Sequence, residues 1–125
     1  MLDGKEALAT VAVRDLQAAK KFYHGTLGLR QTDAQEEEAV TYQVGAAKLL
    51  VYRSQFAGSN KATAVTWLLG RDVEKVVKGL RSKGVTFEHY QMPGLTLRGD
   101  IHEGEGMQAA WFKDPDGNIH ALVSG

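Results

Sequence analysis

The sequence of 125 residues contains no cysteine, only two prolines and no excess of charge of either sign. Without cysteine, the chain has no disulfide framework, no thiolate nucleophile and no thiolate metal site. Fifteen Lys and Arg residues balance fifteen Asp and Glu residues, whereas nucleic-acid-binding domains usually carry a basic patch that supplies much of their affinity. We therefore expect no nucleic-acid partner.

Long hydrophobic runs are also missing. No apolar stretch approaches the roughly 18 residues that span a membrane, and the N-terminus lacks the basic and apolar regions of a signal peptide. We expect no membrane partner and a cytoplasmic location. A chain of this length suffices for one hydrophobic core, so residues 1–125 are predicted to form a single domain.

The most informative feature that is present is an internal repeat. Each copy has an apolar strand, an aspartate and an amphipathic helix, with the aspartates at Asp15 and Asp72. Such an aspartate caps a helix, because its carboxylate accepts hydrogen bonds from the free amides of the first turn. Two copies are too few for a solenoid. We interpret them as a duplicated module, with module 1 at about 5–53, a linker at about 54–62 and module 2 at about 63–125.

Hydrophobic periodicity predicts the same element order in both modules. For module 1 it predicts a helix from Leu16 to Gly28 and strands at 7–13, 29–33, 40–44 and 48–53. For module 2 it predicts a helix from Val73 to Gly84 and strands at 64–69, 85–90, 107–113 and 118–123, the last two joined by a type I turn. Residues 91–106 hold many glycines and are expected to form an irregular loop. The prediction is an α+β fold of two βαβββ modules.

Several segments resemble the vicinal-oxygen-chelate superfamily. They are the doubled βαβββ pattern, Phe-Tyr at 22–23, Leu-Gly-Leu at 27–29 and Asp-Pro-Asp-Gly-Asn at 114–118. This family contains glyoxalases, extradiol dioxygenases, fosfomycin-modifying enzymes and bleomycin-resistance proteins. The segments at 84–88 and 110–113 further resemble a small glyoxalase-like bacterial subgroup. The resemblance implies an incompletely closed, eight-stranded cup with the helices outside.

The resemblance also implies where a metal ion is usually bound. Most enzymes of the family hold a divalent metal with four His, Glu or Gln side chains, one from each of four strands. In this chain the corresponding positions are Leu8, Arg53 (or Tyr52), Val65 and Ala121. Leucine, valine and alanine offer no lone pair, and an arginine is a permanent cation. We therefore expect no metal and no other cofactor.

The four histidines leave a relocated metal site open as an alternative. His24 is expected on the surface near a helix end, whereas His89 and His102 either reach a bound ligand or fill a polar loop. His120 adjoins the fourth family position but is expected to point to the opposite face, because neighbours in a strand alternate. A set such as His102, Glu103 and His120 would indicate a divergent metal-dependent lyase, isomerase or dioxygenase.

Alternation along the strands predicts the lining of the cup. If Leu8 and Val65 face inward, Trp67 and Ala121 face inward as well. Apolar walls with a few polar groups are typical of ligand pockets, and indole faces stack on planar molecules. The predicted ligand-binding residues are Thr10, Tyr52, Arg53, Trp67, His102 and Trp111.

These patterns favour a homodimeric protein of the glyoxalase and bleomycin-resistance type. We predict that it binds a small aromatic or anionic molecule without a metal. Two alternatives remain open, namely the divergent enzyme described above and an interaction module whose cup is filled by its own side chains. In the second alternative the two tryptophans are core residues.

Overall fold

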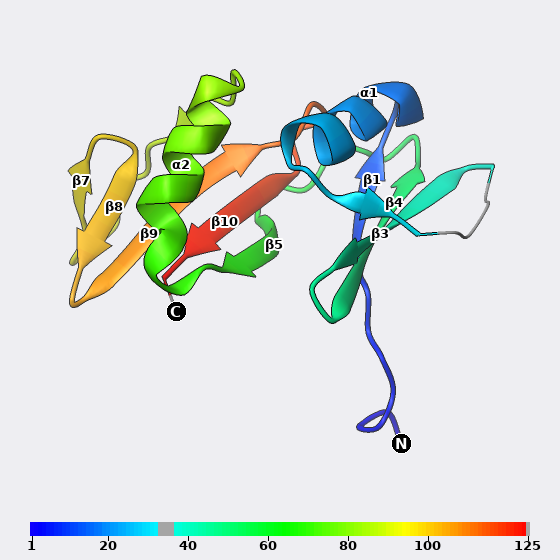
Figure 1. Cartoon of the computed structure of the whole chain (residues 1–125), viewed down its shortest axis with the longest axis horizontal. Helices are drawn as coiled ribbons and strands as arrows, with labels where there is room; N and C mark the ends of the chain where they lie inside the picture. The colour runs from blue at the N-terminus through cyan, green and yellow to red at the C-terminus, as the bar shows by residue number, and fades with distance from the viewer. Residues whose placement is uncertain (33–36, 125) are drawn as a thin grey trace. The chain divides into compact units, whose positions relative to one another are not determined.

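The computed structural model describes residues 1–32 and 37–124 (Figure 1). The chain divides into two compact units, Met1–Ser59 and Asn60–Gly125. Their boundary falls inside the range 54–62 that was predicted to link the modules. No helix in the described residues is long and apolar enough to cross a membrane.

The first unit is a four-stranded sheet with a helix on one face. Its strands are β1 (Ala9–Val13), β2 (Arg30–Gln31), β3 (Ala39–Val44) and β4 (Ala47–Arg53), in the order β1-β4-β3-β2 with β1 parallel to β4. The helix α1 (Leu16–Lys20) continues into the π-helical segment η1 (Lys21–Thr26). Tyr23 of η1 stacks on Tyr42 of β3 with ring centroids 6.0 Å apart, and both rings are buried. The helix therefore covers the Tyr42 face of this sheet.

The start of this helix is as predicted and its end is not. The Asp15 carboxylate accepts hydrogen bonds from the backbone N–H groups of Gln17 at 2.9 Å and Ala18 at 3.2 Å, which satisfies two amides of the first turn. The prediction of a uniform α-helix up to Gly28 is wrong in the last turns. There the N–H of Leu27 donates to the carbonyl of Phe22 at 2.9 Å, five residues back, which widens the coil into a π-helix.

The second unit is a six-stranded sheet with one helix. Its strands are β5 (Thr63–Leu68), β6 (Phe87–Glu88), β7 (Thr96–Arg98), β8 (Ile101–Gly104), β9 (Met107–Lys113) and β10 (Ile119–Val123). The order is β5-β10-β9-β8-β7, with β6 also paired to β9 and only β5 and β10 parallel. The helix α2 (Val73–Ser82) packs against β9 and buries Val73, Val77 and Leu80 (Figure 1).

Residues 91–106, predicted to be an irregular loop, contain a β-hairpin. Strands β7 and β8 pair with Arg98 opposite Ile101, so the turn consists of Gly99 and Asp100 alone. Gly99 has φ of 63°, a conformation that glycine adopts without steric penalty. The hairpin raises the strand number from the predicted eight to ten in the described residues. The predicted strand at 85–90 is reduced to β6.

The α+β class is confirmed, and the first unit has the predicted order of one strand, a helix and three strands, whereas the second unit adds the β7–β8 hairpin to this order. The last helical residues are Thr26 and Ser82, and Gly28 and Gly84 follow them with the positive φ values of 75° and 92° that are expected of glycines closing a helix. The turn between β9 and β10 is also as predicted, because the N–H of Gly117 donates to the carbonyl of Asp114 at 3.0 Å.

Asp72 does not repeat the role of Asp15. Its side chain makes no capping hydrogen bond, and its φ and ψ of −94° and 9° differ from the extended backbone of Asp15. An N-cap residue requires that extended conformation. The reason for the difference is η2 (Gly70–Asp72), a 3-10 turn in which Asp72 is already wound. The two copies share a sequence pattern but begin their helices differently.

Replacing the two aspartates by alanine therefore has unequal effects on stability. Asp15→Ala leaves two amides without their acceptor and lowers the free energy of unfolding by about 1 kcal/mol. Asp72→Ala removes a carboxylate that caps no amide, and it lowers the free energy of unfolding by about 0.5 kcal/mol or less. Urea denaturation of both variants measures the difference. Equal losses at the two positions would contradict the structural assignment.

Candidate functional site

Two of the predicted ligand-binding residues share one face of the first sheet. Tyr52 of β4 pairs with Ala12 of β1, two residues after Thr10. Residues two apart in a strand point the same way, so Thr10 and Tyr52 lie on the face opposite to the helix. We call this the open face of the first sheet, formed by Thr10, Ala12, Leu50 and Tyr52.

Arg53 lies on the other face of this sheet. It pairs with Val13, which is fully buried, and its Nε donates to the Glu38 carboxylate at 2.6 Å. The expectation that Arg53 faces the same way as Thr10 is wrong, because adjacent residues of a strand point to opposite faces. Arg53 instead lines a cavity of about 450 Å³ together with Arg14, Glu38, Ser54 and Gln55.

A bulge in β5 reverses the predicted orientation of Trp67. The register with β10 shifts between Ile119 and His120, so that Ala64 has no partner of its own. Residues after such a bulge point to the face opposite to the one that unbroken alternation predicts. Trp67 lies on the face of His120, and the expectation that it shares a wall with Trp111 is wrong.

His120 is a buried histidine in an aromatic stack on this face. The Nε1–H of Trp67 donates to its Nδ1 at 3.0 Å, and the ring of Phe112 lies parallel to it with centroids 4.8 Å apart. Burial lowers the pKa of His120 to about 4, against the opposing attraction of the Asp114 carboxylate. The ring is therefore neutral at pH 7 and holds Trp67 in place as a hydrogen-bond acceptor.

The opposite face of the second sheet is apolar and aromatic. We call it the Trp111 face of the second sheet, and its residues are Tyr90, Ala109, Trp111, Ile119, Ala121 and Val123. His102 belongs to this face because it pairs with Ala109. Its Nε2 accepts the backbone N–H of Tyr90 at 3.0 Å, and its Nδ1 lies 3.3 Å from the carbonyl of Ala109. Both ring nitrogens are engaged, so the buried ring is fixed.

Three rings on the Trp111 face of the second sheet support one another. The centroids of His102 and Trp111 are 4.9 Å apart, and those of Tyr90 and Trp111 are 5.3 Å apart, both in edge-to-face geometry. Tyr90 stacks on His102 at 6.3 Å. The sequence predicted His102 and Trp111 as site residues, and the structure brings them together. The sequence prediction did not include Tyr90. Its only signal in the sequence was an aromatic residue at the end of a predicted strand.

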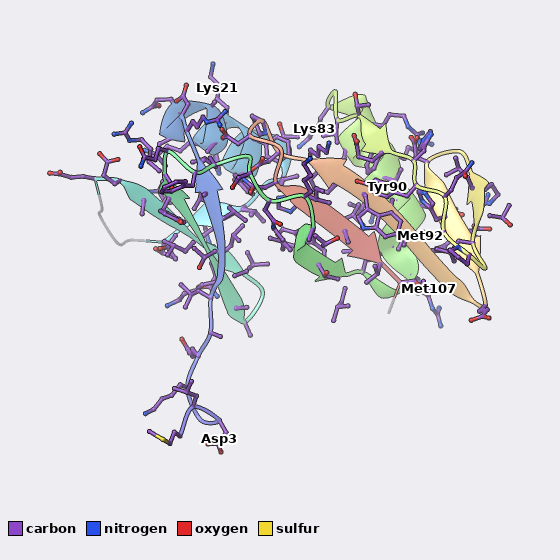
Figure 2. All side chains as sticks on the ribbon, turned by 180° about the vertical axis from the view of Figure 1, so that it is seen from behind. Asp3, Lys21, Lys83, Tyr90, Met92 and Met107 are labelled. Carbon is purple, nitrogen blue, oxygen red and sulfur yellow. The ribbon has the colours of Figure 1, made fainter. Side chains whose placement is uncertain are left out.

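A cavity of about 530 Å³ lies beside Tyr90. Its lining residues are His89, Tyr90, Gln91, Met92, Leu95 and Leu97, of which Tyr90 and Met92 are labelled in Figure 2. The volume falls in the range of about 300–1,000 Å³ that is typical of small-molecule sites. Met92 and Leu97 are 40% and 43% exposed. The cavity therefore presents accessible apolar side chains next to the ring of Tyr90, which packs against His102 and Trp111.

A hydrogen bond to Asp100 holds His89 at the wall of this cavity. Its Nε2 lies 2.7 Å from Oδ1 of Asp100, while Nε and Nη2 of Arg81 donate to Oδ2 of Asp100 at 3.0 and 2.7 Å. The hydrogen bond with His89, and then Arg81, lower the pKa of Asp100 against the opposing effect of burial. Asp100 is therefore ionised at neutral pH.

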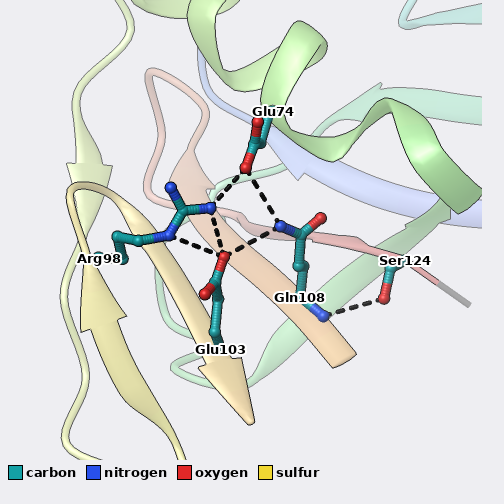
Figure 3. A network of polar contacts seen from close by, with 5 residues as sticks. All are labelled: Glu74, Arg98, Glu103, Gln108 and Ser124. Atoms are coloured by element: carbon teal, nitrogen blue, oxygen red, sulfur yellow. Dashed lines mark hydrogen bonds and ion pairs between the residues drawn. The ribbon is translucent and has the colours of Figure 1, made fainter. Parts of the chain in front are cut away.

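A second polar network lies between the β7–β8 hairpin and α2 (Figure 3). Arg98 donates to the carboxylates of Glu103 and Glu74. Gln108 donates to the same two carboxylates at 3.1 and 3.4 Å, and its backbone N–H donates to Oγ of Ser124 at 2.9 Å. The hydrogen bond from Arg98 is the main cause of the lowered pKa of Glu103. These side chains bond to one another and connect the β7–β8 hairpin to α2.

The structure does not assemble the relocated metal site. His102 lies on the Trp111 face of the second sheet, whereas His120 lies on the opposite face. The carboxylate of Glu103 is bound to Arg98. Within residues 1–32 and 37–124, no group of three or more His, Asp or Glu side chains is close enough to hold a metal ion.

Comparison with protein families identifies a match along nearly the whole chain. The model of the Glyoxalase/Bleomycin resistance protein/Dioxygenase superfamily matches residues 7–122. No curated protein matches the sequence.

Solved structures share the fold over almost their full lengths. A glyoxalase family protein from Enterococcus faecalis is 19% identical, with a TM-score of 0.73 over 98% of this chain and 99% of that one. The fosfomycin resistance protein FosX from Mesorhizobium loti is 15% identical, with a TM-score of 0.70 over 100% and 94%. A superfamily member from Sphaerobacter thermophilus is 27% identical, with a TM-score of 0.65 over 98% of each chain.

The burial of His120 predicts a loss of stability in acid. Its pKa rises from about 4 in the folded chain to 6.5 in the unfolded chain, so the unfolded chain binds more protons between these values. His120 therefore costs stability as the pH falls from 6.5 to 4, by about 3 kcal/mol in total. In His120→Gln this part of the pH dependence disappears, whereas Trp67→Phe, which keeps the histidine, retains it. Parallel stability curves for the wild type and His120→Gln, measured by urea denaturation, would contradict the assignment.

Proposed function

The chain belongs to the Glyoxalase/Bleomycin resistance protein/Dioxygenase superfamily, and we propose that this member binds a small aromatic molecule with its own side chains and without a metal ion. The observation that carries the proposal is the cavity beside Tyr90 on the second unit. The homodimer and the cytoplasmic location expected from the sequence stay predictions.

The residues at the family's metal positions do not fit a metal ion. Leu8, Val65 and Ala121 carry no donor atom, and the Arg53 guanidinium is bound to Glu38. The positions also differ in orientation, because Val65 pairs with His120 and so lies on the face opposite to Ala121. No step of a reaction is therefore assigned to a metal at these positions.

The cavity beside Tyr90 has the chemistry of an aromatic site. Tyr90 presents a ring whose position is fixed by Trp111 and His102 behind it. Met92 and Leu97 add a thioether and an aliphatic group, both of which pack well against aromatic faces. A rigid ring loses little conformational entropy when a ligand binds, which favours affinity. In this proposal His102 and Trp111 act by supporting Tyr90.

Arg53 of the first unit suggests a second, separate place where an anion would bind. Arg53 lines its own cavity with Arg14, and Glu38 occupies its Nε. An anion at this place competes with Glu38 for the guanidinium. Thr10 and Tyr52 stay predicted contacts on the open face of the first sheet. The proposal that the ligand is aromatic therefore rests only on the cavity beside Tyr90 in the second unit.

Substitution of Tyr90 is expected to weaken the binding of single-ring aromatic molecules. Tyr90→Leu keeps an apolar side chain over Trp111 but removes the ring, which lowers affinity roughly tenfold. Phe56→Ala is the matched control, because Phe56 is 71% exposed and does not line this cavity. Calorimetric titration with para-nitroanisole measures both variants. Equal affinity in Tyr90→Leu and wild type, or no binding to the wild type, would contradict the proposal.

Chelation tests the metal-free part of the proposal separately. Since no metal contributes to the cavity beside Tyr90, the dissociation constant for para-nitroanisole is expected to be the same with and without excess EDTA. Addition of zinc or manganese after dialysis is expected to change it by less than about twofold, which is below 0.5 kcal/mol. A chelator-dependent loss of binding that is restored by one of these ions would refute it.

A further inference from the structure

The cavity beside Tyr90 contains one titratable group that aromatic stacking does not use. His89 lines this cavity, and its Nε2 is the nitrogen that faces Asp100 at 2.7 Å. Because the Asp100 carboxylate is ionised and can only accept, Nε2 carries the proton. In the neutral ring the lone pair is then on Nδ1. Among the described residues, none makes a hydrogen bond to this nitrogen.

Asp100 is held so that it can orient His89. It occupies the two-residue turn between β7 and β8, and Arg81 of α2 donates two hydrogen bonds to its Oδ2. Only Oδ1 is directed to the imidazole. A carboxylate in this position fixes the tautomer of a histidine and stabilises the imidazolium that forms when the other nitrogen takes up a proton.

Neighbouring groups do not compete for the same role. His102 is the nearest other histidine, with its ring centroid 6.5 Å from that of His89. Both of its nitrogens are engaged with backbone groups, and its ring is buried. His89 is half exposed and is accessible to a molecule in the cavity. Asp100 accepts hydrogen bonds from both Arg81 and His89, so the imidazole is the group that can accept a proton from a molecule in the cavity.

We infer that Nδ1 of His89, oriented by Asp100, accepts the proton of an acidic hydroxyl group on an aromatic molecule bound in the cavity beside Tyr90. This inference rests on the proposed function, because it requires that the cavity binds an aromatic ring. The O–H bond of the ligand breaks and an N–H bond forms at Nδ1. The products are an aromatic oxyanion and an imidazolium that lies between this oxyanion and the Asp100 carboxylate. No oxidant or metal takes part.

Such a proton transfer gives the cavity a specificity. A ligand with an acidic hydroxyl forms a charge-assisted hydrogen bond to the imidazolium, whereas its methyl ether cannot. The expected preference is about tenfold, which corresponds to about 1.4 kcal/mol. Binding of a neutral hydroxyl compound would also produce its anion, which has its own absorption spectrum.

The pair para-nitrophenol and para-nitroanisole tests the inference with wild-type protein. At a pH where free para-nitrophenol is mostly protonated, binding is expected to increase the nitrophenolate absorption and to be about tenfold tighter than binding of para-nitroanisole. If both probes bind equally and no nitrophenolate forms, the inference is wrong and the proposed aromatic site stands. If neither binds, both are wrong.

Two variants identify the proton acceptor. His89→Gln is expected to abolish the nitrophenolate band of the bound probe, and Asp100→Asn, which alters a positioning residue, is expected to reduce it. His24→Gln is the matched control, since His24 is an exposed histidine of the first unit that bonds to the Leu29 carbonyl. Circular dichroism checks that the variants fold. A full nitrophenolate band in folded His89→Gln would overturn the inference.

Discussion

The arrangement of the second unit depends on the alternation of side chains across the paired strands β9 and β10. Because Ala121 pairs with Trp111 and His120 pairs with Phe112, adjacent residues in each strand serve opposite faces. One face receives the helix α2 and the stack of Phe112, His120 and Trp67. The other receives Trp111, which supports Tyr90. A shift of one residue in this pairing would exchange the two sets and remove the proposed site.

Histidine has two uses in the second unit, and they do not follow this division between the faces. His120 is buried and neutral, and it holds a tryptophan through a hydrogen bond. His102 is equally enclosed, with both nitrogens bound to backbone groups. Among the histidines, and within the described residues, only His89 combines exposure with a carboxylate partner at a cavity wall. The family's usual chemistry needs several donors converging on one metal ion. Here the described donors are dispersed among structural roles, and the cavity beside Tyr90 combines apolar side chains with the imidazole of His89.

Local signals in the sequence were sufficient for much of the fold and for part of the site. The cap at Asp15, the closing glycines Gly28 and Gly84 after the two helices and the turn after β9 each depend on a few neighbouring residues, and the structure has them all. The bulge at Ala64 depends on register with β10, more than fifty positions along the chain, so alternation counted along β5 alone misplaced Trp67. Asp72 failed as a cap because a 3-10 turn precedes the helix. Tyr90 follows a two-residue strand, which periodicity cannot recognise.

The central claim is that a small aromatic molecule binds beside Tyr90 without a metal ion. The chain has three methionines, of which Met92 lines this cavity, Met107 lines a different one and Met1 is fully exposed at the terminus. Methyl-labelled methionine therefore allows a direct measurement by NMR during titration with para-nitroanisole in excess EDTA. The account predicts a saturable shift of the Met92 methyl resonance, with those of Met107 and Met1 unchanged. An unchanged Met92 resonance at saturating ligand, or equal shifts of all three, would contradict it.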